Sequence, residues 1–270
     1  MPTASIDGRE LHYETRGSGP VLLLIQGLSG THLAWGEPFL GELEGEFQLI
    51  VYDHRGIGLS ADAGGPFTIA DLAGDAAGLL GHLGIERAHV IGVSMGGMVA
   101  QELALGHPDL VLTLTLGCTY AGGEGSRLTD PAVIQRLMVA SMSGDRELAL
   151  RTGWEVNASA AFAAAPGNYE EFREMAARLP APIPVLLQQM QATLAHDTSS
   201  RLASLDVPTL VVHGDEDQML DVSNAGQIAA LIPGARLETF EDTGHLFWWE
   251  RPQESAALVR DHVARASAAA

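Results

Sequence analysis

The central segment of this chain reads Val90-Ile91-Gly92-Val93-Ser94-Met95-Gly96-Gly97-Met98. A β-branched run that is typical of a buried strand ends in a serine with a glycine two residues to either side, and a helix-forming segment follows. A serine in such a sharp turn takes a sparsely populated backbone conformation, and glycine neighbours let the strand and the helix pass close together. The Gly-x-Ser-x-Gly pattern between a strand and a helix therefore predicts a turn that exposes the hydroxyl of Ser94.

The first 118 residues alternate between strand-like and helix-like runs. A hairpin with its turn at Asp7-Gly8 is followed by apolar runs of the kind buried on both faces of a sheet, at residues 21–25, 47–52, 88–93 and 111–118. Helical patterns lie between them at residues 35–43, 69–83 and 95–106. This alternation predicts an α/β fold with a mostly parallel sheet and helices on both faces.

The strand pattern is interrupted between residues 119 and 200. Helical stretches occupy about residues 130–142, 146–165, 169–179 and 185–195, and strands return at 207–212 and 235–240, each followed by a helix. We therefore expect an eight-stranded sheet with an all-helical cap inserted after the sixth strand. The predicted division is a core in two parts, 1–118 and 201–270, and a cap at 119–200.

Composition excludes several classes of function. The formal net charge of −19 disfavours nucleic acid and anionic membrane surfaces as partners and favours a small molecule. All 15 basic residues are arginine, so Schiff-base chemistry, a pyridoxal phosphate anchor and a phosphate-loop lysine are excluded.

The first residues resemble no secretion signal and no apolar run is long enough to span a membrane, which predicts a cytoplasmic protein without membrane attachment. The single cysteine, Cys118, is expected to be a core residue.

Four motifs occur in order along the chain: Asp53-x-Arg55-Gly56-x-Gly58-x-Ser60, Gly92-x-Ser94-x-Gly96, His213-Gly214-x-x-Asp217 and Gly244-His245. With them the chain resembles the α/β-hydrolase fold superfamily over its whole length outside the cap. It is similar to the capped serine-type members, which include 3-oxoadipate enol-lactonases, polyketide methylesterases and cofactor-free haloperoxidases. The resemblance implies that Ser94 is the nucleophile, His245 the general base and acid, and Asp217 the residue that orients the imidazole.

The sequence specifies the acid and the oxyanion hole less directly than it specifies Ser94 and His245. Asp215 is the main alternative to Asp217, because sequence spacing does not show which side chain points toward the histidine. The backbone N–H groups of Met95 and Leu28 are the expected oxyanion donors. This family commonly has His-Gly before the second donor, whereas this chain has Gln26-Gly27.

The cap is expected to select the substrate, because lids cover the site and exclude water. Candidate pocket residues are Trp154, Met138, Met142, Met175 and Met190 in the cap and Trp248 after the catalytic histidine. Apolar side chains at helical spacing are more often ordinary core, which is the competing interpretation for each. Arg55 is expected to brace loops rather than to bind substrate.

The resulting prediction is a serine hydrolase that cleaves a small-molecule carboxylic ester or lactone through an acyl-enzyme on Ser94. Carbon–carbon bond hydrolysis and haloperoxidase or perhydrolase activity use the same three residues, and a non-catalytic ligand-binding protein on this scaffold is a further alternative. No cofactor is expected. No metal is expected either, because no two histidines show metal-ligand spacing. The substrate should have an apolar portion, and a homo-oligomer is possible.

Overall fold

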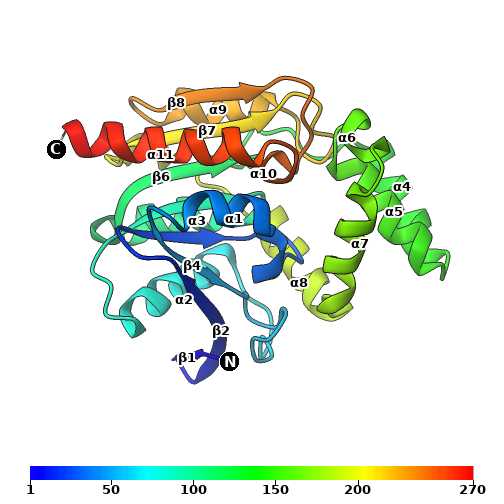
Figure 1. The fold of residues 1–270 in the computed structure, drawn as a ribbon, viewed down its shortest axis with the longest axis horizontal. Coiled ribbons are helices and arrows are strands. Elements are labelled where there is room, and N and C mark those ends of the chain that lie inside the picture. Colours follow the sequence, from blue (N-terminus) through cyan, green and yellow to red (C-terminus); the bar gives the residue numbers. More distant parts are fainter. Residues whose placement is uncertain (270) are drawn as a thin grey trace.

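The computed structural model describes residues 1–269 and contains one eight-stranded sheet (Figure 1). The strands are β1 (Thr3–Ile6), β2 (Arg9–Arg16), β3 (Val21–Ile25), β4 (Gln48–Tyr52), β5 (Ala88–Val93), β6 (Val111–Gly117), β7 (Thr209–Gly214) and β8 (Arg236–Phe240). Their order is β1-β2-β4-β3-β5-β6-β7-β8, and β1 and β2 are antiparallel to their neighbours while β4 to β8 run parallel to β3. The predicted fold class is confirmed.

The β1–β2 hairpin turns where the sequence predicted. Asp7 and Gly8 both have positive φ, at 48° and 79°. Two-residue hairpins favour this conformation because its twist matches that of the paired strands. The hairpin places β2 beside β4 at one side of the sheet.

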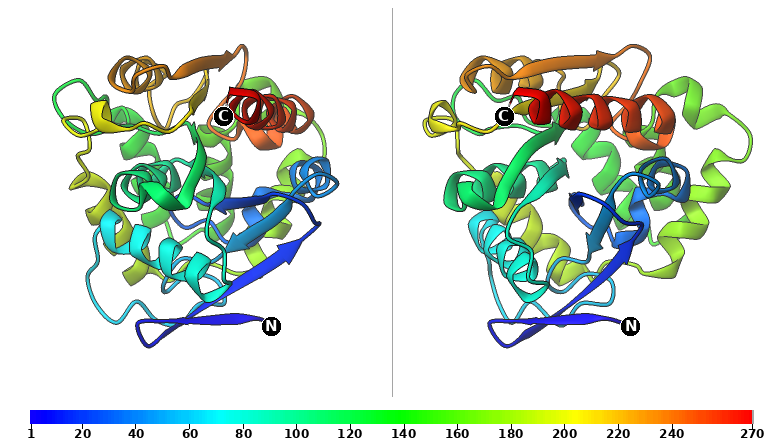
Figure 2. Two further views of the ribbon diagram at one scale, coloured as in Figure 1. Left: turned by 90° about the vertical axis from the view of Figure 1, so that its left-hand side faces the viewer. Right: turned by 60° about the vertical axis from the view of Figure 1, so that its left-hand side comes forward.

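Helices cover both faces of the sheet (Figure 2). On one face lie α2 (Ile69–His82), α3 (Met95–Gly106) and α9 (Ser223–Leu231). On the other lie α1 (Glu37–Leu43), the short α10 (Phe247–Glu250) and α11 (Pro252–Ala269). Short 3₁₀ turns, η1 (His32–Trp35), η2 (Pro108–Leu110) and η3 (Leu202–Ser204), complete the core. Alternate residues of each central strand therefore enter two separate apolar layers.

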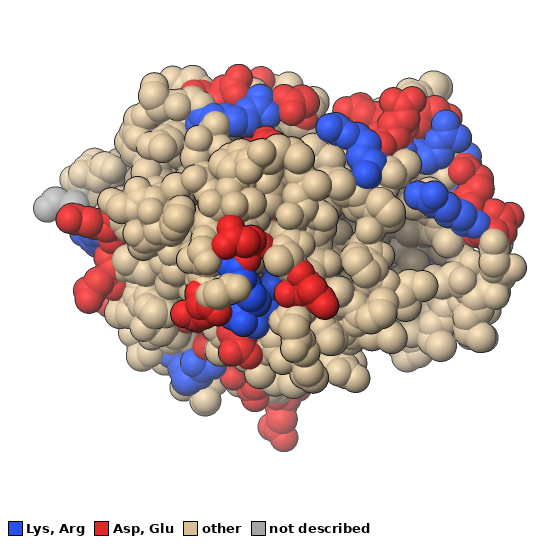
Figure 3. Space-filling view, turned by 90° about the horizontal axis from the view of Figure 1, so that it is seen from below, with Lys and Arg blue, Asp and Glu red and all other residues tan. Residues whose placement is uncertain are grey.

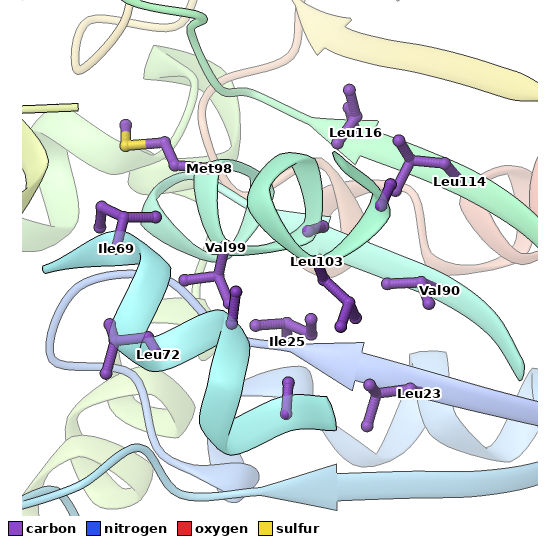
Figure 4. Packing of buried hydrophobic residues seen from close by; sticks show 14 of the residues in the cluster. Leu23, Ile25, Ile69, Leu72, Val90, Met98, Val99, Leu103, Leu114 and Leu116 are labelled. Carbon is purple, nitrogen blue, oxygen red and sulfur yellow. The ribbon is translucent and has the colours of Figure 1, made fainter. Parts of the chain in front are cut away.

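Helix α3 lies at the centre of the larger layer. Val99 and Leu103 of α3 pack between α2 and the sheet, next to Leu23 and Val90 (Figure 4). All four side chains are at most 1% exposed. Burying one such aliphatic side chain contributes about 1.5–3 kcal/mol, so this packing fixes the position of the turn between β5 and α3.

Five helices stand between β6 and β7, where the sequence predicted an all-helical insertion, and we refer to them together as the cap (Figure 1). They are α4 (Pro131–Met142), α5 (Arg146–Asn157), α6 (Ala160–Ala164), α7 (Asn168–Arg178) and α8 (Ile183–Leu194). The helix expected over residues 146–165 is broken in two, because Ser159 is extended and its side chain caps α6 by accepting from the Phe162 N–H. The division into core and cap domains stays a prediction, and its last residue, Ala270, lies outside the described residues.

On the face shown in Figure 3, acidic side chains are distributed rather than gathered in one patch. On the face in Figure 3, most basic groups lie beside acidic ones and large areas carry no charge. Of the helices within residues 1–269, none combines the length and the apolar character needed to cross a bilayer.

Candidate active site

Ser94 lies in the turn between β5 and α3 with a strained backbone, at φ 55° and ψ −125°. This region costs a non-glycine residue about 1–3 kcal/mol and is concentrated at functional sites. The Ser94 N–H donates to the Gly117 carbonyl at 2.9 Å, and its carbonyl accepts from the Thr119 hydroxyl at 2.7 Å. These bonds to β6 and to the residues that follow it hold the strained turn in place.

Two glycines make the turn possible. A Cβ on Gly92 would overlap the Gly96 carbonyl, and a Cβ on Gly96 would overlap the carbonyls of Ile25 and Gln26. These obstacles are backbone atoms, so no side-chain rotation relieves them. The glycines expected from the sequence are therefore required for α3 to start against β3 and β5.

Asp217 and His245 form a buried pair in the loops that follow β7 and β8. Their Oδ2 and Nδ1 atoms are 2.7 Å apart, and the Asp217 side chain is 0% exposed. The other oxygen, Oδ1, accepts from the N–H groups of Met219 and Leu220 at 2.7 and 2.9 Å. His213 Nε2 lies 2.9 Å from Asp217 Oδ2. The carboxylate is fixed from three sides and aligns one edge of the imidazole.

The pair is polarised electrostatically. Burial works against the charged form of Asp217, but the charge of His245 and hydrogen bonds from His213 and His245 outweigh it and hold the pKa of Asp217 well below its usual range. Burial likewise opposes the charged imidazole, yet the Asp217 carboxylate raises the pKa of His245 well above its ordinary value. This is the arrangement expected of a base that is stabilised when it accepts a proton.

The structure places Asp217, and not Asp215, against His245. Asp215 is exposed, and its carboxylate is 3.4 Å from the Thr243 N–H. The loop that carries His245 is held by Glu250, which accepts from the Gly244 N–H at 2.9 Å and from the Ser159 hydroxyl at 2.6 Å. Glu250 therefore links the His245 loop to the cap, a contact that the sequence did not indicate.

Ser94 and His245 line the same cavity, which has a volume of about 390 Å³ and lies between the sheet and the cap. Across residues 1–269, the two side chains share no direct hydrogen bond in this structure. Catalytic hydrogen bonds are often long before substrate binds and tighten in the complex. The cavity brings the hydroxyl and the imidazole to one space that a substrate can enter.

The loop after β3 forms another wall of this cavity. Gln26 Oε1 accepts from the Gly27 N–H at 3.1 Å, and Gln189 of α8 accepts from the Ser29 N–H at 2.8 Å. Within the described chain, neither the Leu28 N–H nor the Met95 N–H has a protein acceptor. Gln26 thus supports the loop, and both predicted oxyanion donors keep their N–H groups available.

The structure separates the predicted pocket residues into two groups. Trp248 lines the cavity and donates to the Ala34 carbonyl at 3.0 Å. Trp154, Met138 and Met142 are not among the lining residues of the described chain. Trp154 is 0% exposed within the cap, against Phe162 and Tyr169. Met138 and Met142 are 55% and 81% exposed on α4. The expectation that these three residues line the pocket is wrong, because α4 turns the two methionines to solvent and Trp154 of α5 packs in an aromatic core within the cap.

Other lining residues come from parts of the cap that carried no clear signal. Met175, named from the sequence, does line the cavity, whereas Met190 does not and is 44% exposed. Phe172, from α7, lines it as well. Arg146, the first residue of α5, is the one arginine among the described lining residues, and no carboxylate within residues 1–269 lies in ion-pair range of it. The position of Arg146 next to a helix cap does not indicate from the sequence that its side chain lines the cavity.

Arg55 supports a loop of the core, and Cys118 is a buried neighbour of the Asp217–His245 pair. Arg55 is buried and binds the Asp75 carboxylate through two hydrogen bonds of 2.6 and 2.7 Å, so it braces the loop after β4 as expected.

Cys118 lies beside the Asp217–His245 pair, and the ligand atoms of the three residues are within 4.8 Å of one another. Burial raises the pKa of the Cys118 thiol, which keeps it neutral. The hydrogen bond between Asp217 and His245 is shorter than the separation of about 3.4 Å between two ligands of a tetrahedral zinc ion. These three residues therefore fit a hydrogen-bonded proton better than a metal ion.

Comparisons with known proteins agree with this geometry. A family model described as alpha/beta hydrolase fold matches residues 20–252. The "Putative carbamate hydrolase RutD" of Azorhizobium caulinodans is 32% identical over 254 residues, which cover 92% of each chain. Among solved structures, the enol-lactonase from Burkholderia xenovorans has a TM-score of 0.84 at 28% identity, covering 97% of this chain and 100% of its own. Est816, described as an N-acyl homoserine lactone degrading enzyme, has a TM-score of 0.79 at 29% identity, covering 96% and 99%.

Proposed function

This chain is a hydrolase that belongs to the α/β-hydrolase fold family, and from that premise we propose that it cleaves a small carboxylic ester or lactone through an acyl-enzyme on Ser94. The observation that carries the proposal is the buried 2.7 Å hydrogen bond between Asp217 and His245, with His245 and Ser94 lining one cavity. A serine hydroxyl is a poor nucleophile at neutral pH unless an oriented base removes its proton. This site supplies the base and its orienting acid.

The proposed first half-reaction forms the acyl-enzyme. Ser94 Oγ attacks the substrate carbonyl carbon while its proton passes to His245 Nε2, and Asp217 holds the proton on Nδ1 and stabilises the imidazolium. The bond between the carbonyl carbon and the leaving oxygen then breaks, and His245 returns the proton to that oxygen. In the second half-reaction His245 takes a proton from water while the water oxygen attacks the acyl carbon. The bond between that carbon and Ser94 Oγ then breaks, and His245 returns the proton to Oγ as the acid leaves.

The negative charge that develops on the carbonyl oxygen needs donors that do not have to reorganise. The N–H groups of Leu28 and Met95 fit this role, since neither has a protein acceptor in the described residues. The Met95 N–H also stands at the positive end of the α3 dipole. One such donor is worth about 10² to 10³ in turnover.

The cavity lining favours a substrate with an apolar body. Its lining includes the large apolar side chains of Phe172, Met175, Trp248 and Trp249, and Ser94 and His245 are among its polar residues. A volume near 390 Å³ suits a small molecule. The similarity to an enol-lactonase and to a lactone-degrading enzyme supports this substrate class, and the carbamate hydrolase relatives add a carbonyl bonded to nitrogen as a related target.

Replacing the nucleophile tests the proposal. In Ser94→Ala, release of p-nitrophenol from p-nitrophenyl butyrate should fall by about 10⁶-fold, because loss of the nucleophile removes the whole acyl-enzyme route. Ser200→Ala, an exposed serine outside the cavity, is the matched control and should keep full activity. Retained activity in Ser94→Ala would overturn the mechanism.

A panel of enol-lactones, methyl esters and p-nitrophenyl esters then identifies the substrate class. Turnover of a vinylogous diketone would point to carbon–carbon hydrolysis, and turnover of acetate with peroxide to perhydrolase activity. Tight binding with no turnover of any compound would favour a ligand-binding protein.

A further inference from the structure

A second histidine–carboxylate group, which we call the β2–η1 cluster, lies outside the cavity and consists of His12, Glu14 and His32. His12 and Glu14 are two residues apart on β2, so the pleat of the strand points both side chains to the same face. His32 comes from η1, which follows the cavity loop after β3. The two imidazole rings have centroids 4.7 Å apart and are steeply inclined to each other.

Both histidines are held by their Nδ1 atoms. His12 Nδ1 is 3.1 Å from the Pro2 carbonyl oxygen, and His32 Nδ1 is 2.9 Å from Asp53 Oδ1. A carbonyl and an ionised carboxylate accept hydrogen bonds but do not donate them, so each Nδ1 carries its proton. The Nε2 atom of each neutral imidazole therefore presents a lone pair to the cluster, which is the form that binds metal ions.

The three inward atoms are spaced as metal ligands rather than as hydrogen-bond partners. His12 Nε2 and His32 Nε2 lie 3.7 and 3.6 Å from Glu14 Oε1, which is too long for a hydrogen bond. Two ligands of a tetrahedral zinc ion, each 2.0–2.2 Å from the metal, are about 3.4 Å apart. His12 is 0% exposed, and its Nε2 has no hydrogen-bond partner among the described residues.

The local charge also favours a cation. Glu14 lies inside the cluster, and Asp53 lies directly behind His32. Arg178 of α7 is the positive charge that acts on His32 from the cap. Among the described residues, two carboxylates and one guanidinium therefore act on His32, so the local charge around this side chain is net negative.

We propose that His12, Glu14 and His32 bind one divalent transition-metal ion of the Zn²⁺ type through Nε2, Oε1 and Nε2. Glu14, whose side chain is 42% exposed, leaves room for water as the remaining ligand. None of the three residues lines the cavity in the described chain, so the ion is structural. It joins β2 to His32, whose N–H also binds Asp53 at 2.7 Å, and so it anchors the end of the loop that carries the oxyanion donor Leu28.

The β2–η1 cluster differs from the group of Cys118, Asp217 and His245 in where the hydrogen-bond acceptors of the histidine Nδ1 atoms lie. In the group of Cys118, Asp217 and His245, the Asp217 carboxylate already accepts a hydrogen bond from His245 Nδ1. In the β2–η1 cluster the Nδ1 atoms are bound by acceptors outside the cluster, and the Nε2 atoms have no hydrogen-bond partner among the described residues. A histidine next to a carboxylate therefore makes a proton site in one place and part of a metal site in the other.

Titration of untagged, chelator-treated protein with Zn²⁺, followed by calorimetry and elemental analysis, tests the proposal. The wild type should bind one equivalent, and a hundredfold excess over Kd should raise Tm by about 5 °C. Co²⁺ at the same site should give the visible absorption of a low-coordinate nitrogen–oxygen complex. Glu14→Gln and His32→Gln should each weaken binding by about 100-fold or more, as expected for loss of one of three ligands.

Matched controls separate this site from other metal-binding residues. Glu10→Gln makes the same change on the same strand, and His107→Gln removes an exposed histidine, so both should bind like the wild type. His245→Gln should also keep the equivalent. Absence of stoichiometric binding by the folded wild type would overturn the proposal, as would binding that is lost in His245→Gln but kept in Glu14→Gln.

Discussion

The loops at the carboxyl ends of the strands and the cap that faces them line one cavity, but they fix their side chains by different means. Ser94, Asp217 and His245 stand directly after strands and are held by backbone geometry and short hydrogen bonds. The cap contributes Phe172 and Met175 from the inner surface of helices whose packing depends mainly on side chains. In the proposed function the first set carries out the reaction, and the second determines which substrates fit the cavity.

This contrast teaches where substitutions should act. A change at the strand ends should lower turnover of every substrate, because it affects the reacting atoms or their alignment. A change in the cap should alter stability or the preference between substrates by smaller factors. The predictions below test that division in order of expected effect.

The largest effect after loss of the nucleophile is expected at Asp217. Asp217→Asn removes the charge that fixes the proton on His245 Nδ1, so kcat for p-nitrophenyl butyrate should fall by about 10⁴-fold. Asp215→Asn, in the same loop, should reduce kcat less than threefold. A larger loss in Asp215→Asn than in Asp217→Asn would break the assignment of the acid.

Trp154 tests the cap as a packed unit. Truncation of this fully buried ring in Trp154→Ala should lower the free energy of unfolding by about 3–5 kcal/mol, measured by urea denaturation. Met138→Ala, on the exposed face of α4, should change it by less than about 0.5 kcal/mol. Equal effects of the two variants would show that the cap is not organised around Trp154.

The pH dependence of kcat/KM tests the electrostatics of the pair. The base must be neutral, so activity should rise as pH increases through the pKa of His245. Because Asp217 raises that pKa, the midpoint should lie above the ordinary histidine value of about 6.5. The residual activity of Asp217→Asn should have a lower midpoint. A wild-type midpoint below 6.5 would contradict the described ion pair.

The smallest effect is expected at Arg146, on the cap side of the cavity. An exposed ion pair is worth about 0.2–1 kcal/mol, so Arg146→Gln should lower kcat/KM for mono-p-nitrophenyl succinate by up to about fivefold. The rate for neutral p-nitrophenyl butyrate should not change. Arg136→Gln, on α4 outside the cavity, is the control. A similar loss for both substrates would mean that Arg146 acts on the chemistry rather than on selection.

The contrast between the loops after the strands and the cap also explains which parts of the site could be predicted from the sequence. The strand–turn–helix around Ser94 was predictable because strained turns require glycine at fixed positions, and the loops after β7 and β8 follow strands that are easily recognised. The choice of Asp217 over Asp215 needed the structure, since it depends on the direction of a side chain.

Positions in the cap depend on how helices rotate against one another, which local pattern does not encode. Trp154, Met138 and Met142 were therefore misplaced, and Arg146 and Phe172 were missed. The β2–η1 cluster was missed for a related reason. His12 and Glu14 share a strand face by simple alternation, but His32 joins them only through tertiary packing.

The central claim is that Ser94 is an activated nucleophile, and covalent labelling by a fluorophosphonate tests it most directly. Intact-mass measurement should show one adduct on the wild type, with the modified peptide containing Ser94, and labelling in Asp217→Asn should be slower by orders of magnitude. Ser94→Ala should remain unlabelled. A wild-type protein that stays unlabelled while it is folded, or an adduct that persists in Ser94→Ala, would contradict the account.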